Sequence, residues 1–223
     1  MTVYISFERR KKWPLGWRHP EALTETVRGM GIGIVLISLV FLMIWGLGGL
    51  DIVILDWSAS FLPSLALTVL LFACVAVSEE FFSRGYVQGL IRDQYGTKAA
   101  IIVSSFLFTL LHALNPDVFS SPLPVVNLFL AGLLFGISRE VSGGLWMPIG
   151  LHFTWNLLQG SLFGFPVSGL PIDSVLTHHA AGSDVLTGGG FGAEGSIIAT
   201  VVFLVGTFLI YRFYPPRERM ALY

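Results

Sequence analysis

Long apolar runs separated by short polar segments form the dominant pattern along this chain. Six runs approach or reach the length of a bilayer-spanning helix, and they cover approximately 30–50, 61–80, 98–115, 122–138, 142–164 and 195–214. A spanning helix needs about 20 mostly apolar residues, so the fourth run is short. The pattern predicts an all-α fold, a polytopic membrane bundle of about six transmembrane helices plus one or two interfacial amphipathic helices.

The composition supports a membrane protein. Hydrophobic residues make up 54% of the chain and charged residues only 12%, whereas typical globular proteins carry about 25% charged residues. A soluble fold could not hide so much apolar surface behind a polar exterior. A net charge of −1 gives no argument for nucleic acid, and the single cysteine, Cys74, excludes a disulfide framework. The lipid bilayer is therefore an expected partner and nucleic acid is not.

The basic residues divide unevenly between the two sides of such a bundle. With the N-terminus inside and six spans, all 13 Lys and Arg residues fall in inner segments, whereas the outer segments carry acidic residues such as Glu194. The positive-inside rule then places both termini in the cytoplasm. We expect a multi-pass protein of a cell membrane, with the bacterial plasma membrane favoured.

The domain organisation follows from these segments. Residues 1–28 are expected to be a basic cytoplasmic or interfacial segment, without the apolar core of a cleaved signal peptide. Residues 29–214 would form a single transmembrane domain, and 215–223 a cytoplasmic tail. The outer segment 165–194 is long and rich in glycine, and we expect a lid or packing loop there. His178 and His179 in this loop are interpreted as solvated residues.

Two glutamates and an arginine interrupt the second apolar run. Charged groups at membrane depth are costly, about 2.5–3.5 kcal/mol each on insertion scales. Glu80 and Arg84 are four residues apart, so they share a helix face and can form an ion pair. Glu79 lies about 100° around the helix from Glu80, so it is left to face another group. The spacing predicts a supporting pair and one free carboxylate.

Depth matching indicates that other polar residues meet this carboxylate. If the second helix continues to about Arg92 and turns at residues 93–98, the distance of each residue from the inner end can be estimated at 1.5 Å per residue. Glu79, His112 and His152 then lie at depths of roughly 20, 21 and 15 Å. Three helices would therefore bring these side chains to one layer. We interpret this layer as a functional site and not as a set of interhelical hydrogen bonds that only stabilises the packing of the bundle.

The residue types suit activation of water. Glu79 could act as general base, and His152 and Asn156 could donate hydrogen bonds to the oxyanion of a tetrahedral intermediate. His112 could orient the water, donate a proton or bind a metal. Two histidines and a carboxylate also match the ligands of a catalytic zinc site, so Glu79, His112 and His152 could hold a divalent metal. We expect no required cofactor, and a proton-coupled carrier remains an alternative.

Three ordered motifs resemble those of a known family. "EEFFSR" (79–84) fits EExxxR, "FTLLH" (108–112) fits FxxxH and "HFTWN" (152–156) fits HxxxN. The chain thus resembles the CPBP family of membrane proteases (CAAX-processing and bacteriocin-processing, also called Abi), which includes the type II CAAX prenyl endopeptidase. The resemblance covers about residues 60 to 165. Ser83 departs from the aromatic residue common before the Arg-Gly pair.

The resemblance implies an intramembrane endopeptidase. It implies that Glu79 activates water, that His112 assists, and that His152 and Asn156 form the oxyanion site. Glu80 and Arg84 would be structural support, together with Phe108 from the second motif. The substrate would be a peptide or protein that is membrane-associated, prenylated or leader-bearing. The alternative within this fold is a non-catalytic membrane scaffold or immunity protein.

Overall fold

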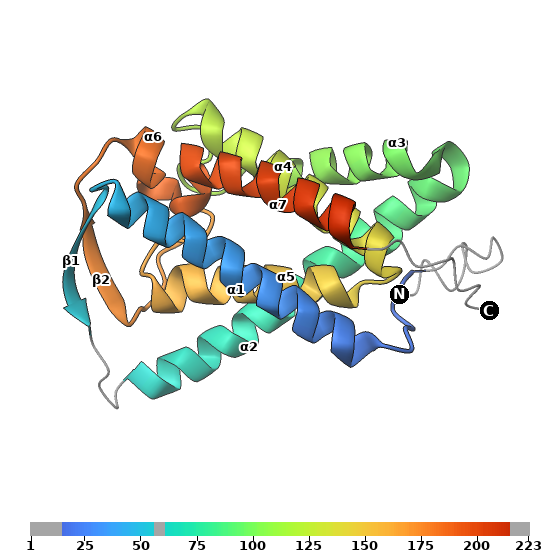
Figure 1. The fold of residues 1–223 in the computed structure, drawn as a ribbon, viewed down its shortest axis with the longest axis horizontal. Coiled ribbons are helices and arrows are strands. Elements are labelled where there is room, and N and C mark those ends of the chain that lie inside the picture. Colours follow the sequence, from blue (N-terminus) through green and yellow to red (C-terminus); the bar gives the residue numbers. More distant parts are fainter. Residues whose placement is uncertain (1–14, 56–60, 215–223) are drawn as a thin grey trace.

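The computed structural model describes residues 15–55 and 61–214. The basic cluster at residues 9–12 and the tail at 215–223 lie outside the described residues, so the predictions made for them stay predictions. The described part is a bundle of helices with a small sheet at one end (Figure 1).

The long helices follow the apolar runs closely. In chain order they are α1 (Ala22–Gly46), α2 (Phe61–Glu80), the π-helix η3 (Phe81–Val87), α3 (Gln88–Leu111), α4 (Pro122–Ser142), α5 (Trp146–Leu157), the π-helix η4 (Leu158–Leu162) and α7 (Ile197–Phe213). Within the described part of the chain, three helices are long and apolar enough to cross a membrane, namely Ala22–Gly46, Phe61–Leu111 and Pro122–Ser142. The total of six spans stays a prediction.

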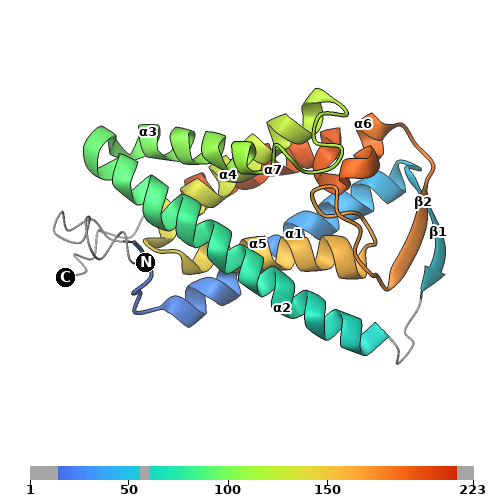
Figure 2. The same ribbon diagram turned by 180° about the vertical axis from the view of Figure 1, so that it is seen from behind.

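The second helix runs far beyond its apolar run. Residues 61–111 form 51 residues of almost continuous helix, about 76 Å at 1.5 Å per residue. Gly96 has φ 82° and ψ 172° and interrupts α3, so residues 61–95 and 97–111 form the two arms of a hairpin (Figure 2). A positive φ of this kind is readily adopted by glycine. The predicted continuation past Glu80 and the turn at 93–98 are both confirmed.

The bundle has two distinct ends. The turn end contains Gly96, the start of α1 and the end of α7, and the sheet end contains the strands and the start of α2 (Figure 1). At the turn end the Tyr214 hydroxyl donates to Glu25, with distances of 2.7 and 2.6 Å to its two carboxylate oxygens. The first and last described helices are therefore tied together at the same end.

A two-stranded sheet adds a small β component to the mostly helical fold that the sequence predicted. β1 (Leu50–Leu55) pairs antiparallel with β2 (Leu176–Ala180), with Leu50 opposite Ala180 and a register shift between Ile52 and Ile54. The β-branched run after α1 favours a strand. Its partner lies more than a hundred residues away, so the local pattern does not reveal the pairing.

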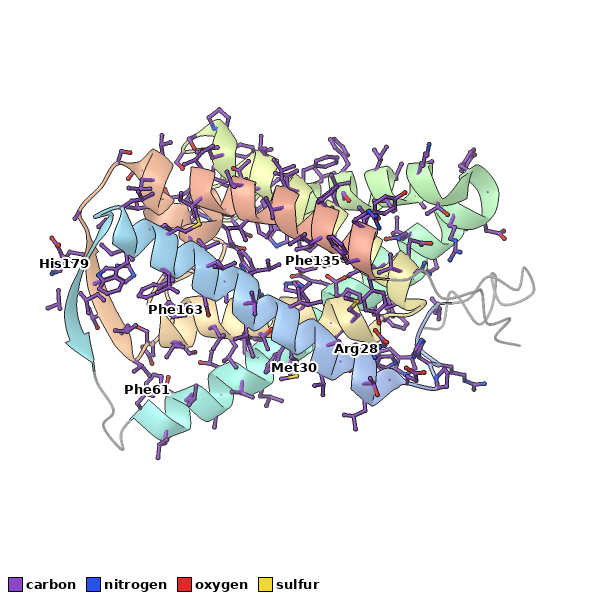
Figure 3. The ribbon with its side chains drawn as sticks, viewed as in Figure 1. Arg28, Met30, Phe61, Phe135, Phe163 and His179 are labelled. Atoms are coloured by element: carbon purple, nitrogen blue, oxygen red, sulfur yellow. The ribbon has the colours of Figure 1, made fainter. Side chains whose placement is uncertain are left out.

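The segment 165–194 is more structured than a plain loop. It contains β2, the short helix α6 (Asp184–Thr187), the 3-10 turn η5 (Gly189–Phe191) and part of the 3-10 turn η6 (Ala193–Gly195). Phe165, Val175 and Phe191 are buried, which confirms the predicted packing role. His178 and His179 lie in β2, and Figure 3 shows His179 at the sheet end while Phe135 lies inside the bundle. His179 is exposed, but both ring nitrogens of His178 are buried and its ring centroid lies 4.7 Å from that of Phe165, so the interpretation as a solvated residue is wrong for His178.

Close packing between α1 and α5 fixes the position of the third motif. A Cβ atom at Gly29 would clash with the Met147 carbonyl, and one at Gly33 would clash with Thr154. Small residues let membrane helices approach closely. The Thr154 hydroxyl also lies 3.1 Å from the Met30 carbonyl oxygen, to which it donates. Since α5 carries His152 and Asn156, this contact helps to position the site.

Candidate active site

The ion pair at the end of α2 lies in the interior. Arg84 Nη1 is 3.3 Å from Glu80 Oε1, and neither side chain is exposed. Arg84 Nη2 donates to the Gly132 carbonyl of α4 at 3.1 Å, and the guanidinium lies 4.4 Å from the Phe108 ring centroid and 5.2 Å from that of Phe135. The predicted pair is confirmed, and it joins α2 to α3 and α4.

Glu80 also holds the histidine of α5. His152 Nδ1 lies 3.0 Å from Glu80 Oε1, and the ring stacks on Phe135 with centroids 4.8 Å apart. The carboxylate accepts, so Nδ1 carries the proton and Nε2 stays available to the site. The sequence predicted that Glu80 pairs with Arg84 alone, because helical spacing says nothing about a partner 72 residues away.

Glu79 faces the histidine of the second motif. Its Oε2 is buried, has no hydrogen-bond partner among the described residues, and lies 3.9 Å from His112 Nε2. His112 Nδ1 is 2.8 Å from the Phe108 carbonyl oxygen, to which it donates. His112 follows the last residue of α3, Leu111, and caps the helix, so the helix ends earlier than the predicted 115. The expected convergence of Glu79, His112 and His152 is confirmed.

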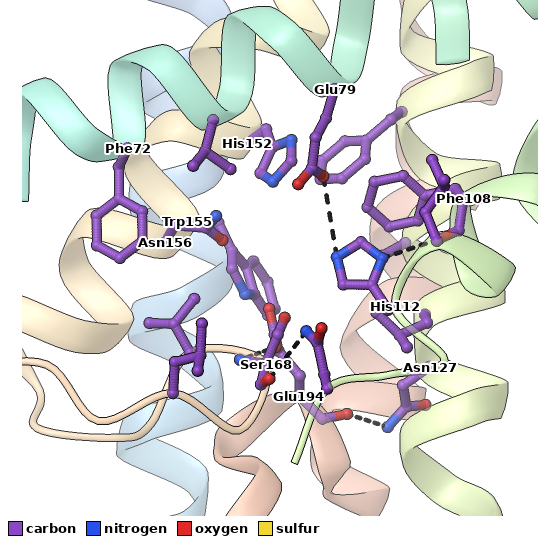
Figure 4. A pocket seen from close by; sticks show the side chains of 18 of the residues that line it. Phe72, Glu79, Phe108, His112, Asn127, His152, Trp155, Asn156, Ser168 and Glu194 are labelled. Carbon is purple, nitrogen blue, oxygen red and sulfur yellow. Dashed lines mark hydrogen bonds and ion pairs between the residues drawn. The ribbon is translucent and has the colours of Figure 1, made fainter. Parts of the chain in front are cut away.

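These groups line a cavity of about 420 Å³. Its walls are mostly apolar and come from α2, α3, α4, α5, α7 and the segment after η4. The polar lining side chains are Glu79, His112, Asn115, Asn127, His152, Asn156, Ser168 and Glu194. Asn156 is buried and its amide has no hydrogen-bond partner in the described part of the chain. Figure 4 shows Glu79 and His112 joined on one side of the cavity and Glu194 on the opposite side.

Glu194 is a cavity residue that sequence reasoning missed, since it was assigned to an outer segment. It is only 8% exposed, and its Oε2 accepts hydrogen bonds from the Ser168 backbone N–H at 2.9 Å and from the Ser168 hydroxyl at 2.8 Å. Burial raises the pKa of its carboxyl, while the Ser168 hydroxyl and the nearby His112 and His152 oppose that shift. Glu194 lies in a glycine-rich segment without helical or strand periodicity, so the sequence pattern does not predict that its side chain is buried.

The residues that the sequence names as possible metal ligands line the cavity but are not gathered into a ligand cluster in the described part of the chain. No group of three or more His, Cys, Asp or Glu side chains within 15–55 and 61–214 is arranged to hold a metal ion. His152 directs Nδ1 to Glu80 at 3.0 Å, and His112 directs Nδ1 to a backbone carbonyl. Both Nε2 atoms are thereby left toward the cavity, the orientation that a histidine ligand also adopts, so a metal held by Glu79, His112 and His152 stays an alternative to metal-free catalysis.

The fold and the site together define a multi-helix membrane protein with a buried carboxylate–histidine site. Residues 60–158 match the model of a family described as "Rce1-like: Type II CAAX prenyl endopeptidase Rce1-like". This segment holds all three motifs, so the resemblance read from them is confirmed over these residues.

A relative and the solved structures add little further detail. An Escherichia coli protein named "Uncharacterized 24.3 kDa protein" is 32% identical over 106 residues, which cover 46% of this chain and 46% of that protein. The match thus spans about half the length of that relative. No solved structure matches the chain.

Proposed function

We propose that the chain is an intramembrane endopeptidase in which Glu79 activates the attacking water. The observation that carries this proposal is the distance of 3.9 Å between Glu79 Oε2 and His112 Nε2 in the cavity. Glu79 Oε2 is buried there and accepts no hydrogen bond from the described residues. A buried carboxylate oxygen without a partner is costly, and such groups concentrate at functional sites. The match of residues 60–158 to an endopeptidase family supports the same reaction class.

The two acceptors are arranged to orient one water molecule. His112 Nδ1 donates to the Phe108 carbonyl, so in the neutral ring Nε2 is an acceptor. A water between Nε2 and Glu79 could donate one hydrogen to each and direct a lone pair at the substrate carbonyl. In the first step the water oxygen forms a bond to the carbonyl carbon, and Glu79 takes the proton.

The oxyanion that forms in this step would be stabilised by His152 and Asn156. Because His152 Nδ1–H is used by Glu80, donation from Nε2 requires a ring protonated on both nitrogens. The Glu80 carboxylate supports that state electrostatically, and the Asn156 amide supplies a second donor. In the second step the C–N bond breaks, the oxyanion collapses to a carboxyl group, and the leaving amine takes the proton from Glu79.

The cavity suits an apolar peptide segment or a lipidated one. Its walls include Leu71, Phe72, Val75, Leu111 and Leu128. Leu71 and Leu111 line the cavity and are still 50% and 52% exposed, which supports an entrance to the cavity between α2 and the end of α3. We therefore propose a membrane-associated peptide or protein substrate, prenylated or leader-bearing, and a location in a cell membrane, the bacterial plasma membrane by preference.

The decisive experiment replaces Glu79 by Gln in purified protein. Cleavage of a panel of prenylated CAAX peptides and leader peptides is measured by mass spectrometry. We expect cleavage to fall by about 10²–10⁴-fold, the usual contribution of a general base. Asp173→Asn is the matched control, because Asp173 is an exposed acid on the segment after η4 that does not line the cavity. Its carboxylate accepts a hydrogen bond from the Ser64 hydroxyl at 2.6 Å, which the Asn oxygen can still accept. Retention of wild-type cleavage by Glu79→Gln would exclude the assignment.

The same preparation tests the alternatives. A scaffold or immunity protein would cleave none of the panel, whereas a proton-coupled carrier would move solute into liposomes in response to a proton gradient. For the metal question, elemental analysis and chelator treatment are applied to the wild type. We propose activity without a metal, so cleavage should survive chelation, and a stoichiometric metal with chelator-sensitive cleavage would contradict this.

A further inference from the structure

Glu194 is a second buried carboxylate on the cavity, and it lies outside the residues that match the family. It belongs to η6, just before α7, and Figure 4 shows it across the cavity from Glu79. Nothing in the proposed hydrolysis uses it. An acid that is only 8% exposed needs a physical reason to be there.

The position of Glu194 is fixed through both its side chain and its backbone. Ser168 donates two hydrogen bonds to Oε2. The Asn127 amide of α4 donates to the Glu194 carbonyl oxygen at 2.6 Å, and the Asn127 Oδ1 accepts from the Thr200 hydroxyl of α7 at 2.7 Å. Oε1 accepts no hydrogen bond from the described residues. The carboxylate is thus held rigidly, with one oxygen free at the cavity.

Among the described residues no Lys or Arg balances the charge of Glu194, in contrast to Glu80, Glu25 and Glu140. Glu80 pairs with Arg84, Glu25 with Arg28, and Glu140 with Arg92. Within 15–55 and 61–214, Glu194 forms no ion pair with Lys or Arg. Burial favours the neutral carboxyl, whereas the two donors on Oε2 and the nearby His112 and His152 favour the carboxylate. A buried carboxylate of this kind is stabilised by a cation that arrives with a ligand.

We propose that Glu194 is a specificity-determining residue that binds a positively charged group of the peptide substrate. The group is a Lys or Arg side chain, or the peptide's amino terminus. This inference rests on the proposed endopeptidase function, since the peptide would bind Glu194 with one residue and present its scissile bond to Glu79. The apolar walls between these two acids would accommodate the intervening residues.

The test uses synthetic apolar peptides that carry a single Lys moved along the sequence, each compared with its norleucine counterpart. Affinity is measured by fluorescence anisotropy in the Glu79→Gln background, which keeps binding separate from cleavage. At the best Lys position we expect about 10- to 100-fold tighter binding than for norleucine, typical of a hydrogen bond to a charged group. An N-acetylated set of peptides distinguishes a side-chain cation from the amino terminus.

Adding Glu194→Gln should remove this preference. The Gln amide oxygen can still accept both Ser168 bonds, so the substitution removes the charge and keeps the local structure. Asp173→Asn, the control that leaves the cavity unchanged, should keep the preference. Lys and norleucine peptides should then bind Glu194→Gln equally, at the norleucine affinity of the parent.

Several outcomes would overturn the inference. One is a parent protein that binds Lys and norleucine peptides equally at every position and loses no affinity when the peptides are N-acetylated, or that binds no peptide at all. Another is a Glu194→Gln variant that still binds the Lys peptide more tightly than the norleucine peptide. A third is a variant whose affinity for both peptides falls by the same factor, which would indicate a purely structural role. A clear Lys preference in a protein that cleaves no peptide would instead reject the proposed reaction and leave the cation site standing.

Discussion

Two adjacent glutamates have different environments, and we propose a different role for each. Glu80 is fully buried and contacts both Arg84 and His152, so its charge is compensated and its position is fixed. Glu79 is 29% exposed at its side chain and faces the cavity and His112. The same functional group thus supports the site at one position and is available for chemistry at the next. The two proposed roles can be tested by making the same substitution, Glu to Gln, at each position in turn.

We predict that Glu80→Gln lowers stability far more than Glu79→Gln does. Removing the charge of Glu80 leaves the Arg84 guanidinium buried without its counter-ion, and breaking a buried pair costs about 3–5 kcal/mol. For a chain of this size that corresponds to a fall in Tm on the order of 10 °C. Glu79→Gln removes no hydrogen bond and should shift Tm by about 1–2 °C at most.

The measurement is thermal unfolding of both variants and the wild type in one detergent. Peptide cleavage, where detected, should be lost in both variants, so that stability separates the two roles. Equal Tm values for Glu79→Gln and Glu80→Gln would contradict the assignment of Glu80 and Arg84 as structural support.

At the scale of elements, a long helix and a close crossing bring the motifs together. α2 continues into the π-helix η3 directly after Glu80, and π-helical turns are frequent at functional sites. Gly96 then ends this arm and lets α3 return, so that His112 comes back to the layer of Glu79. On the other side, α1 crosses α5 at Gly29 and Gly33. The site is therefore built from elements that approach closely only because small residues lie between them.

We predict opposite effects for alanine at two neighbouring glycines of α1. A Cβ atom at Gly29 would meet the backbone of Met147, whereas one at Gly31 has nothing within 4 Å. Gly29→Ala should destabilise the protein by about 1–3 kcal/mol through overpacking, and it should reduce cleavage because α5 carries His152. Gly31→Ala should leave cleavage unchanged and stabilise by up to about 1 kcal/mol through helix propensity.

Thermal unfolding and peptide cleavage of the two alanine variants check this prediction. Matched losses in both variants would mean that helix α1 tolerates no side chain at either position, and that the close crossing with α5 is not what distinguishes them.

The sequence predicted the elements of the site better than their contacts. Helical spacing was sufficient for Glu80 and Arg84, because both residues lie on one helix, and depth matching was sufficient for the convergence of Glu79, His112 and His152. The hydrogen bond from His152 to Glu80 depends on how α5 is rotated against α2, and residue spacing carries no such information. Glu194 and the β1–β2 pairing depend on long-range contacts of an irregular segment, where no periodicity guides a prediction.

At the scale of the whole molecule, the two ends of the bundle differ in composition. Arg28, Arg92, Arg139 and Arg212 lie on helices near the turn end, whereas the sheet end is formed by β1, β2 and α6 (Figure 1). The proposed orientation places the turn end in the cytoplasm, in line with the positive-inside rule. The cavity then lies between the turn end and the sheet end, and Glu194 is on the side nearer the sheet end.

We predict that reporter cysteines at the two ends are labelled from opposite sides of the membrane. In a Cys74→Ala background, Tyr95→Cys marks the turn end and Val185→Cys marks the sheet end, since these side chains are 69% and 54% exposed. A membrane-impermeant maleimide should label Val185→Cys in intact bacterial cells and Tyr95→Cys only in inverted vesicles. Labelling of both cysteines from the same side would contradict a bundle whose helices cross the bilayer between these two ends. Labelling of Tyr95→Cys alone in intact cells would show that the bundle has the opposite orientation, with the turn end outside.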